Sequence, residues 1–179
     1  SSCSQMRTAS QPASASTRAV GWVRFVYLWL IGATIGLMAA HNMLDITRKE
    51  KLKFDQIERI TAHVAPGAQE ICNRPAPKSI GDLQFSYQHN LAAAAMDGDV
   101  SYAHIANERI ADPRFVQART KVAVVIRSEW ANDMPLHAPA RLEIKLHDGR
   151  SFASERAYPT GTLEEPLSLD EVKALFHKF

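Results

Sequence analysis

Alternating apolar and polar residues are clearest near the end of the chain, in "ARLEIKLHDGRSFASERAY". Leu142, Ile144 and Leu146 alternate there with charged or polar residues. This period of two is typical of a strand with one buried face. The Asp148-Gly149 pair that follows predicts a type I′ turn and a return strand. The stretch therefore predicts an antiparallel hairpin.

Further elements follow from the same pattern upstream. Alternation over residues 55–66 and a β-branched run over 122–129 predict two more strands. A stretch with three prolines and two glycines, residues 66–82, predicts a loop. Helices are expected, from alanine content, apolar spacing and capping residues, over residues 20–53, 83–98, 101–110, 112–122 and 168–179.

The order of these elements predicts an α+β fold, with a small antiparallel sheet packed by helices on one face. Residues 1–19 are polar and lack periodicity, so a disordered tail is expected there. Residues 20–40 are expected to form a hydrophobic helix between this tail and the α+β domain.

The overall composition excludes several classes of function. With 21 Lys and Arg against 19 Asp and Glu, the net charge is only +2, and nothing predicts a nucleic-acid partner. The seven histidines lack metal-ligand spacing, so neither a metal nor a cofactor is predicted. Cys3 and Cys72 lie far apart, which favours free thiols in a reducing compartment.

The uncharged run over residues 25–40 leaves three alternatives open. Its 16 residues fall short of the roughly 20 that a membrane-spanning helix needs, and extending it would include Arg24 and His41. Only arginines among the charged residues precede Asp45, a composition typical of a transit peptide. The run is therefore a membrane span, a targeting segment or a buried helix of a larger fold.

Most isolated polar residues have an ordinary structural interpretation. His63 and His147 are expected on solvated strand faces, and Asp97 and Asp99 in a turn around a glycine. The polar stretch over 85–90, "FSYQHN", could bind an anion at a helix N-terminus, but helix capping is favoured. His41 is either a core histidine or one that faces a cleft. The residues alone assign no reaction.

Several stretches in order resemble the C-terminal part of the MmgE/PrpD family, which includes 2-methylcitrate dehydratase and is related to cis-aconitate decarboxylase. The family shows an alternating strand, "DG", a return strand, a glycine, "PLS" and an acidic helix ending in "KF". These are matched here by Asp148-Gly149, Gly161, Pro166-Leu167-Ser168 and Lys178-Phe179. "FSYQHNLAAAAMDGDV" is similar to another family helix. The resemblance covers residues 41–179, the C-terminal domain only.

The resemblance implies a soluble enzyme, usually dimeric, whose active site lies between a large helical domain and a small α+β domain. Such enzymes remove a proton next to a carboxylate of a di- or tricarboxylate and expel water or carbon dioxide, without a metal. "HNMLDI" matches the family's histidine and the helix after it, which implies a catalytic role for His41 and places Asp45 on the pattern. No substrate-binding residue is indicated.

The chain also departs from the family. "IGATIGLM" stands where the family has a lysine-containing "K-x-Y-P" segment, and the large helical domain has no counterpart. We therefore expect the C-terminal domain of a metal-independent lyase or isomerase, incomplete alone and active on a polycarboxylate when a helical domain completes it. The expected location is the cytoplasm or the mitochondrial matrix. The alternative is a non-catalytic, membrane-anchored domain that binds a protein partner.

Overall fold

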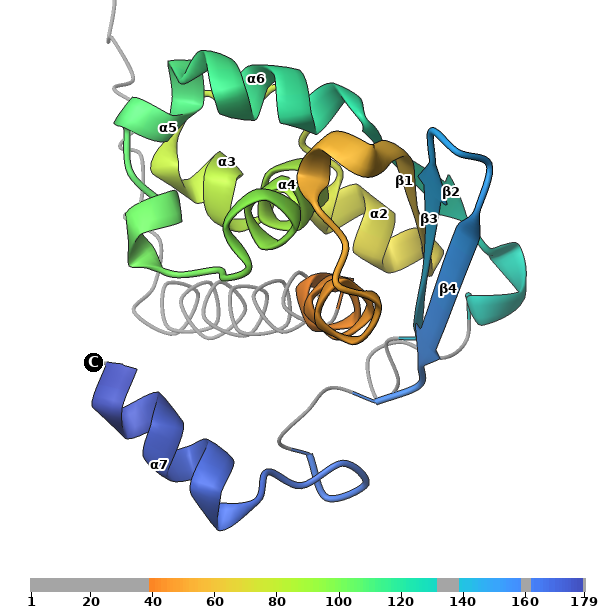
Figure 1. Ribbon diagram of the computed structural model, residues 1–179, viewed down its shortest axis with the longest axis vertical. Coiled ribbons are helices and arrows are strands. Elements are labelled where there is room, and N and C mark those ends of the chain that lie inside the picture. The colour runs from red at the N-terminus through yellow and green to blue at the C-terminus, as the bar shows by residue number, and fades with distance from the viewer. Residues whose placement is uncertain (1–38, 132–138, 159–161, 179) are drawn as a thin grey trace, which may run out of the picture. The chain divides into compact units, whose positions relative to one another are not determined.

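The computed structural model describes residues 39–131, 139–158 and 162–178, all within the compact unit Ile31–Phe179. A helix over residues 39–50, here called the His41 helix, comes first (Figure 1). The elements after it are η1 (Phe54–Gln56), β1 (Ile57–Val64), α2 (Pro66–Cys72), α3 (Ile80–Gln84), α4 (Tyr87–Asp97), η2 (Tyr102–His104), α5 (Glu108–Ala111), α6 (Pro113–Thr120), β2 (Val122–Ile126), η3 (Ser128–Trp130), β3 (Ala140–Leu146), β4 (Ser151–Arg156) and α7 (Leu169–Lys178).

The four strands form one sheet in the order β2-β1-β3-β4. This confirms the α+β class, with one difference in the sheet. β1 pairs with β3 in antiparallel register, Ile60 opposite Ile144, but it pairs with β2 in parallel, Ile60 opposite Val122. The connection from β1 to β2 runs through helices and returns the chain to the same end of the sheet, which is what a parallel pair requires. The sheet is therefore mixed.

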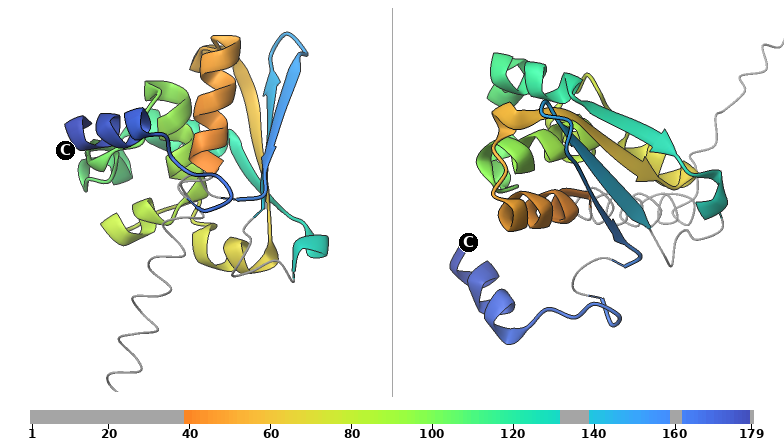
Figure 2. Two further views of the ribbon diagram at one scale, coloured as in Figure 1. Left: turned by 90° about the horizontal axis from the view of Figure 1, so that it is seen from below. Right: turned by 45° about the vertical axis from the view of Figure 1, so that its right-hand side comes forward.

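One face of the sheet supplies most of the core. The side chains that alternate toward the helices are buried on both central strands, namely Ile60, Ala62 and Val64 on β1 and Leu142, Ile144 and Leu146 on β3. Figure 2 shows the helices on one side of the sheet. The helices cover this face of the sheet, so each apolar position of β3 packs against the helical layer. This explains the regular alternation of apolar and polar residues in the β3 sequence.

Helix α4 lies inside this layer. Ser86 caps its start, accepting a hydrogen bond from the backbone N–H of His89 at 3.0 Å. Gly98 ends it in the left-handed conformation, with φ +66°. The alanine run predicted to face a close neighbour, residues 92–95, is buried. Small side chains allow α6, α3 and β2 to pack around the helix.

The loop predicted over residues 66–82 is wrong in part, because α2 and α3 lie within it. Pro66 stands in the first turn of α2, where its missing N–H leaves no hydrogen bond unmade. Ser79 caps α3 through the N–H of Asp82 at 3.1 Å. The helix expected over residues 101–110 is replaced by the two short pieces η2 and α5. Proline counts alone therefore overstated the irregular structure.

The hairpin of β3 and β4 is confirmed, but its turn is not type I′. The Leu146 carbonyl accepts from the Gly149 N–H at 3.1 Å, and the Leu146 N–H donates to the Arg150 carbonyl at 2.9 Å. Gly149 has φ +87°, while Lys51 is the only described non-glycine residue with a positive φ. Asp148 therefore lacks the positive φ that type I′ needs, and the turn is a type I turn closed by a glycine bulge.

Two helices at the ends of the described chain bear on the predictions. The capping box of α7 is confirmed, since Ser168 N–H donates to Glu171 at 2.8 Å and Glu171 N–H donates to Ser168 at 3.3 Å. Ala39 and Ala40, the last residues of the hydrophobic run, are buried in the His41 helix. The predictions for residues 1–38 lie outside the described residues. Within the described ranges, no helix is long and apolar enough to cross a membrane.

Two glycine-to-alanine substitutions are expected to have opposite effects. Gly98→Ala places a side chain at φ +66° and should lower the free energy of unfolding by about 1 kcal/mol. Gly81 lies inside α3, where an added Cβ meets only Ser79 Oγ at 3.8 Å. Gly81→Ala should leave stability unchanged or raise it by up to about 1 kcal/mol. Urea unfolding of both variants measures the difference, and equal losses would contradict it.

Candidate functional site

His41 lies in the first described turn of the His41 helix and is half-buried. Its neighbours Ala40 and Asn42 are fully buried, whereas Asp45 is exposed. Residues four apart lie on the same helix face, so His41 and Asp45 share one side of the helix. Within the described part of the chain, no hydrogen bond involves the His41 ring. The site predicted from the family pattern is thus a histidine at the border between core and surface.

Asn42 attaches this helix to the sheet. Its side chain is 0% exposed, so its amide must find partners inside the protein. Asn42 Nδ2 donates to the Ala140 carbonyl at 3.1 Å, and Ser154 Oγ donates to Asn42 Oδ1 at 3.4 Å. These bonds join the helix to the start of β3 and to β4, and they set the rotation of the helix that carries His41.

Arg156, the last residue of β4, forms two ion pairs beside this attachment. Arg156 Nη2 lies 2.5 Å from Asp45 Oδ2, and Arg156 Nη1 lies 2.8 Å from Glu165 Oε1. The side chain of Arg156 is only 24% exposed, and the two ion pairs outweigh burial and raise its pKa. One guanidinium thus connects the His41 helix, β4 and the segment before α7.

Burial and charge together lower the pKa of His41 below its usual value. Burial has the largest effect, and the positive charge of Arg156 adds to it, while Asp45 acts in the opposite direction. A lowered pKa means that the imidazole is neutral near pH 7 and has a nitrogen lone pair available. His41 is therefore in the form that can accept a proton from a carbon acid.

Two hollows occur on the described surface. One, with a volume of about 360 Å³, lies between the His41 helix and β4 and is lined by Asp45, Lys49, Ser151 and Ser154 among others. The other, of about 510 Å³, lies beside Pro75 and Val116. His41 lines neither. Among the described residues, no group of three or more His, Cys, Asp and Glu side chains is placed to hold a metal ion.

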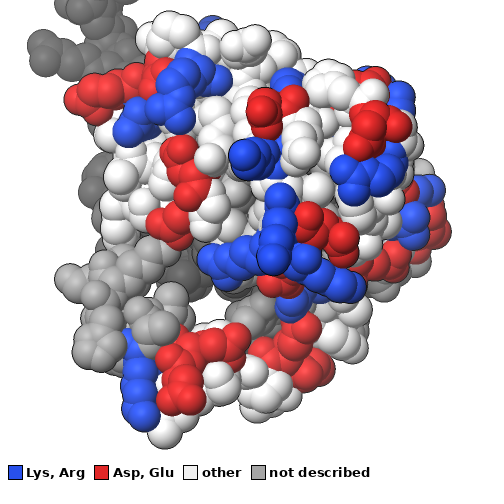
Figure 3. Space-filling model, in the orientation of Figure 1, with Lys and Arg blue, Asp and Glu red and all other residues white. Residues whose placement is uncertain are grey.

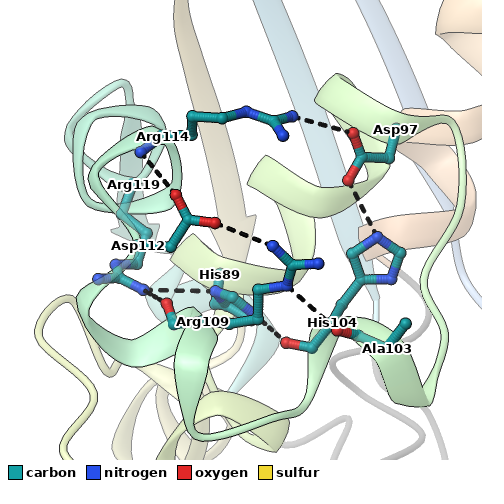
Figure 4. Close-up of polar contacts among 8 residues, drawn as sticks. All are labelled: His89, Asp97, Ala103, His104, Arg109, Asp112, Arg114 and Arg119. Atoms are coloured by element: carbon teal, nitrogen blue, oxygen red, sulfur yellow. Dashed lines mark hydrogen bonds and ion pairs between the residues drawn. The ribbon is translucent and has the colours of Figure 1, made fainter.

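A second polar cluster, drawn in Figure 4, lies between α4 and α6, and its His89, His104 and Arg119 are buried. His89 Nε2 lies 2.6 Å from the His104 carbonyl, which only accepts, so the neutral ring carries its proton on Nε2. Its Nδ1 then accepts from Arg119 Nη1 at 3.4 Å. Burial chiefly lowers the pKa of His89 to about 4. Arg119 also donates to the Ile110 carbonyl at 2.8 Å, which caps α5.

His104 completes this cluster at the end of α4. Its Nδ1 accepts from the Ser101 N–H at 3.0 Å, and its Nε2 donates to Asp97 Oδ2 at 3.1 Å. Arg114 lies 3.4 Å from the other Asp97 oxygen. The buried members of the cluster have protein partners that join successive elements, so the cluster is explained by packing. Asp97, which was predicted to lie in a turn, is instead the last residue of α4, directly before the Gly98 cap.

His63 differs from its prediction as a solvated residue. It is 7% exposed, because Arg127 and Glu143 flank it on the outer face of the sheet. Arg127 Nε donates to His63 Nδ1 at 3.1 Å, and His63 Nε2 lies 3.4 Å from Glu143 Oε2. His147 is exposed, as predicted. On the face shown in Figure 3, acidic and basic side chains likewise lie beside one another.

Ser86 and its neighbours follow the capping interpretation rather than anion binding. Ser86 Oγ donates to the Arg74 carbonyl at 2.6 Å, and Gln88 Nε2 donates to Asn73 Oδ1 at 2.6 Å. Sequence reasoning missed Arg156 and Glu165. Glu165 does lie beside the "PLS" motif, which is the one local signal for it. Arg156 has no such signal, since its partners come from distant segments.

A mixed sheet covered by helices, with a half-buried histidine on the helix attached to it, defines a small α+β domain. The family model described as the MmgE/PrpD C-terminal domain matches residues 36–179. The chain therefore belongs to the MmgE/PrpD family, through its C-terminal domain. A comparison with curated proteins finds no match.

The buried His89 predicts a loss of stability in acid. Its pKa is about 4 in the folded protein and 6.5 when unperturbed, so the unfolded chain binds the extra proton between these values. The free energy of unfolding should therefore fall as pH falls from about 6.5 to 4. At roughly 1.4 kcal/mol per pKa unit, the loss from His89 is about 3 kcal/mol.

Urea unfolding between pH 4 and 7 measures this dependence. His89→Gln keeps a donor toward the His104 carbonyl but cannot titrate, so its stability should vary less with pH than that of the wild-type protein. His147→Gln, at an exposed position, is the matched control and should keep the wild-type dependence. The expectation is wrong if His89→Gln also keeps it.

Proposed function

We propose that this domain belongs to a lyase or isomerase of the 2-methylcitrate dehydratase type, which acts on small di- or tricarboxylates without a metal. His41 is its acid–base residue, and a helical domain completes the site. Membership of the family supports the reaction class. The observation that carries the role of His41 is its lowered pKa at a half-buried position on the matched helix.

The proposed chemistry needs two kinds of group. A base removes the proton next to a carboxylate, and cations stabilise the enediolate-like charge that develops. His41 supplies a neutral imidazole for the first task. Arg156 is already paired with two carboxylates, so the three side chains together carry a net charge of −1. The cations for the second task are therefore expected from the helical domain.

The remaining parts of the proposal rest on the family resemblance. The substrate is a small polycarboxylate, the assembled enzyme is a homodimer, and its location is the cytoplasm or the mitochondrial matrix. His41 lies at the border of this domain, and its ring has no hydrogen-bond partner among the described residues. An active site formed between two domains also explains this, since the partner would come from the other domain.

The first test assays the 179-residue polypeptide by itself. We expect no turnover of 2-methylcitrate or of cis-aconitate, because a base without stabilising cations gives little rate enhancement. Absorbance assays for dehydration and decarboxylation measure this. Clear turnover that disappears in His41→Ala would show that the polypeptide needs no helical domain.

The second test places the domain in a complete enzyme. The C-terminal domain of a 2-methylcitrate dehydratase is replaced by the part of this chain that begins at Ala39. The chimera thus keeps the dehydratase's own lysine-containing segment. The chimera should dehydrate 2-methylcitrate, and His41→Ala should lower kcat by roughly 10²–10⁴-fold, the usual contribution of an acid–base group.

The matched control in the chimera is His147→Ala, at the exposed hairpin turn, which should keep kcat unchanged. Circular dichroism confirms that each variant is folded. If His41→Ala and His147→Ala have the same kcat as the parent chimera, His41 is not the acid–base residue.

A further inference from the structure

One carboxylate oxygen of Glu165 is buried without a hydrogen-bond donor, whereas the other forms an ion pair. Oε1 lies 2.8 Å from Arg156, and the Glu165 N–H is bound to Thr162 Oγ1 at 3.3 Å. Oε2 is buried and has no hydrogen-bond partner among the described residues. A buried carboxylate oxygen without a donor is costly, so its position indicates that a donor is missing.

His41 is the complementary group. Its ring has no hydrogen bond within the described residues, and it is close enough to Glu165 for the carboxylate to raise its pKa. Both residues also share Arg156, which binds Glu165 directly and Asp45 on the helix face of His41. The guanidinium that binds Glu165 therefore also binds the carboxylate one helical turn after His41, and its charge acts on the imidazole.

We infer that Glu165 is a positioning residue for His41: Arg156 holds its Oε1, and its free Oε2 accepts a hydrogen bond from one N–H of the His41 ring. This hydrogen bond fixes the proton on one ring nitrogen, which selects one tautomer. The other ring nitrogen is then free to act as the base. The bond is not formed in the described conformation, so forming it requires a side-chain rotation. The inference rests on the proposed function for the role of His41, but the pairing itself needs no turnover.

Other charges act on the same ring and must be separated from Glu165. They come from Asp45 and Arg48 on the His41 helix, Arg156 on β4 and Glu171 in α7. Burial and the arginines lower the pKa of His41, whereas Asp45 and Glu165 raise it. Removing only the charge of Glu165 should therefore lower the pKa further, while removing a distant charge should not.

The test is an NMR titration of the ¹⁵N-labelled His41 ring in the 179-residue chain. In Glu165→Gln, the pKa of His41 should fall relative to wild type, and the ring should lose the preference for one tautomer. Glu164→Gln is the matched control, since Glu164 is an adjacent, exposed glutamate that forms no ion pair with another described residue. It should leave both the pKa and the tautomer unchanged.

Arg156→Gln provides a second variant with an independent readout. It releases Glu165 from its ion pair, so the tautomer preference of His41 should weaken as it does in Glu165→Gln. Amide spectra confirm that the variants keep the fold. The inference is overturned if Glu165→Gln matches wild type or Glu164→Gln in both readouts, or if Arg156→Gln keeps the full tautomer preference. A pairing detected in a protein whose chimera has no turnover would refute the proposed function and keep this inference.

Discussion

The position of the candidate site depends on one buried amide. Asn42 is fully enclosed, and its two polar ends meet the Ala140 carbonyl and Ser154 Oγ. A buried amide that loses its partners costs about 1–3 kcal/mol, so few rotations of the helix are acceptable. The one that satisfies Asn42 places His41 at the edge of the core and Asp45 toward Arg156. The geometry of the site thus follows from a hydrogen-bonding requirement of its neighbour.

Local patterns predicted the elements whose causes are local. The alternation of Leu142, Ile144 and Leu146 identified β3, and Asp112 with Pro113 identified the start of α6, where Asp112 accepts from the Arg114 N–H. The errors arose where partners are distant. The parallel pairing of β1 with β2 depends on the path of the intervening helices. The burial of His63 depends on Glu143, which lies in β3, and on Arg127, which directly follows β2.

In the candidate site, too, the residue with a local sequence signal was predicted and the residues that depend on distant partners were not. His41 was found through the family pattern, because that pattern is a short stretch of one helix. Arg156 and Glu165 were not found, since their roles arise only when β4 and the segment before α7 meet the His41 helix. The capping prediction for residues 85–90 was correct for Ser86, which caps α4, but it did not predict the buried cluster around His89. Its link to Arg119 joins residues 30 positions apart and could not be predicted from spacing alone.

The central place of β1 has a consequence for how the chain folds. β1 comes first among the described strands, yet both of its neighbours come much later in the chain, since Ile60 pairs with Val122 and with Ile144. The β3–β4 hairpin and the α4–α6 pair can form from nearby residues. β1 can pair only after both β2 and β3 have been brought to it. Until then its two edges are unpaired and its apolar face is exposed. Contacts between such distant residues slow folding and prolong exposure to aggregation. We therefore expect β1 to be the last strand to complete its pairing.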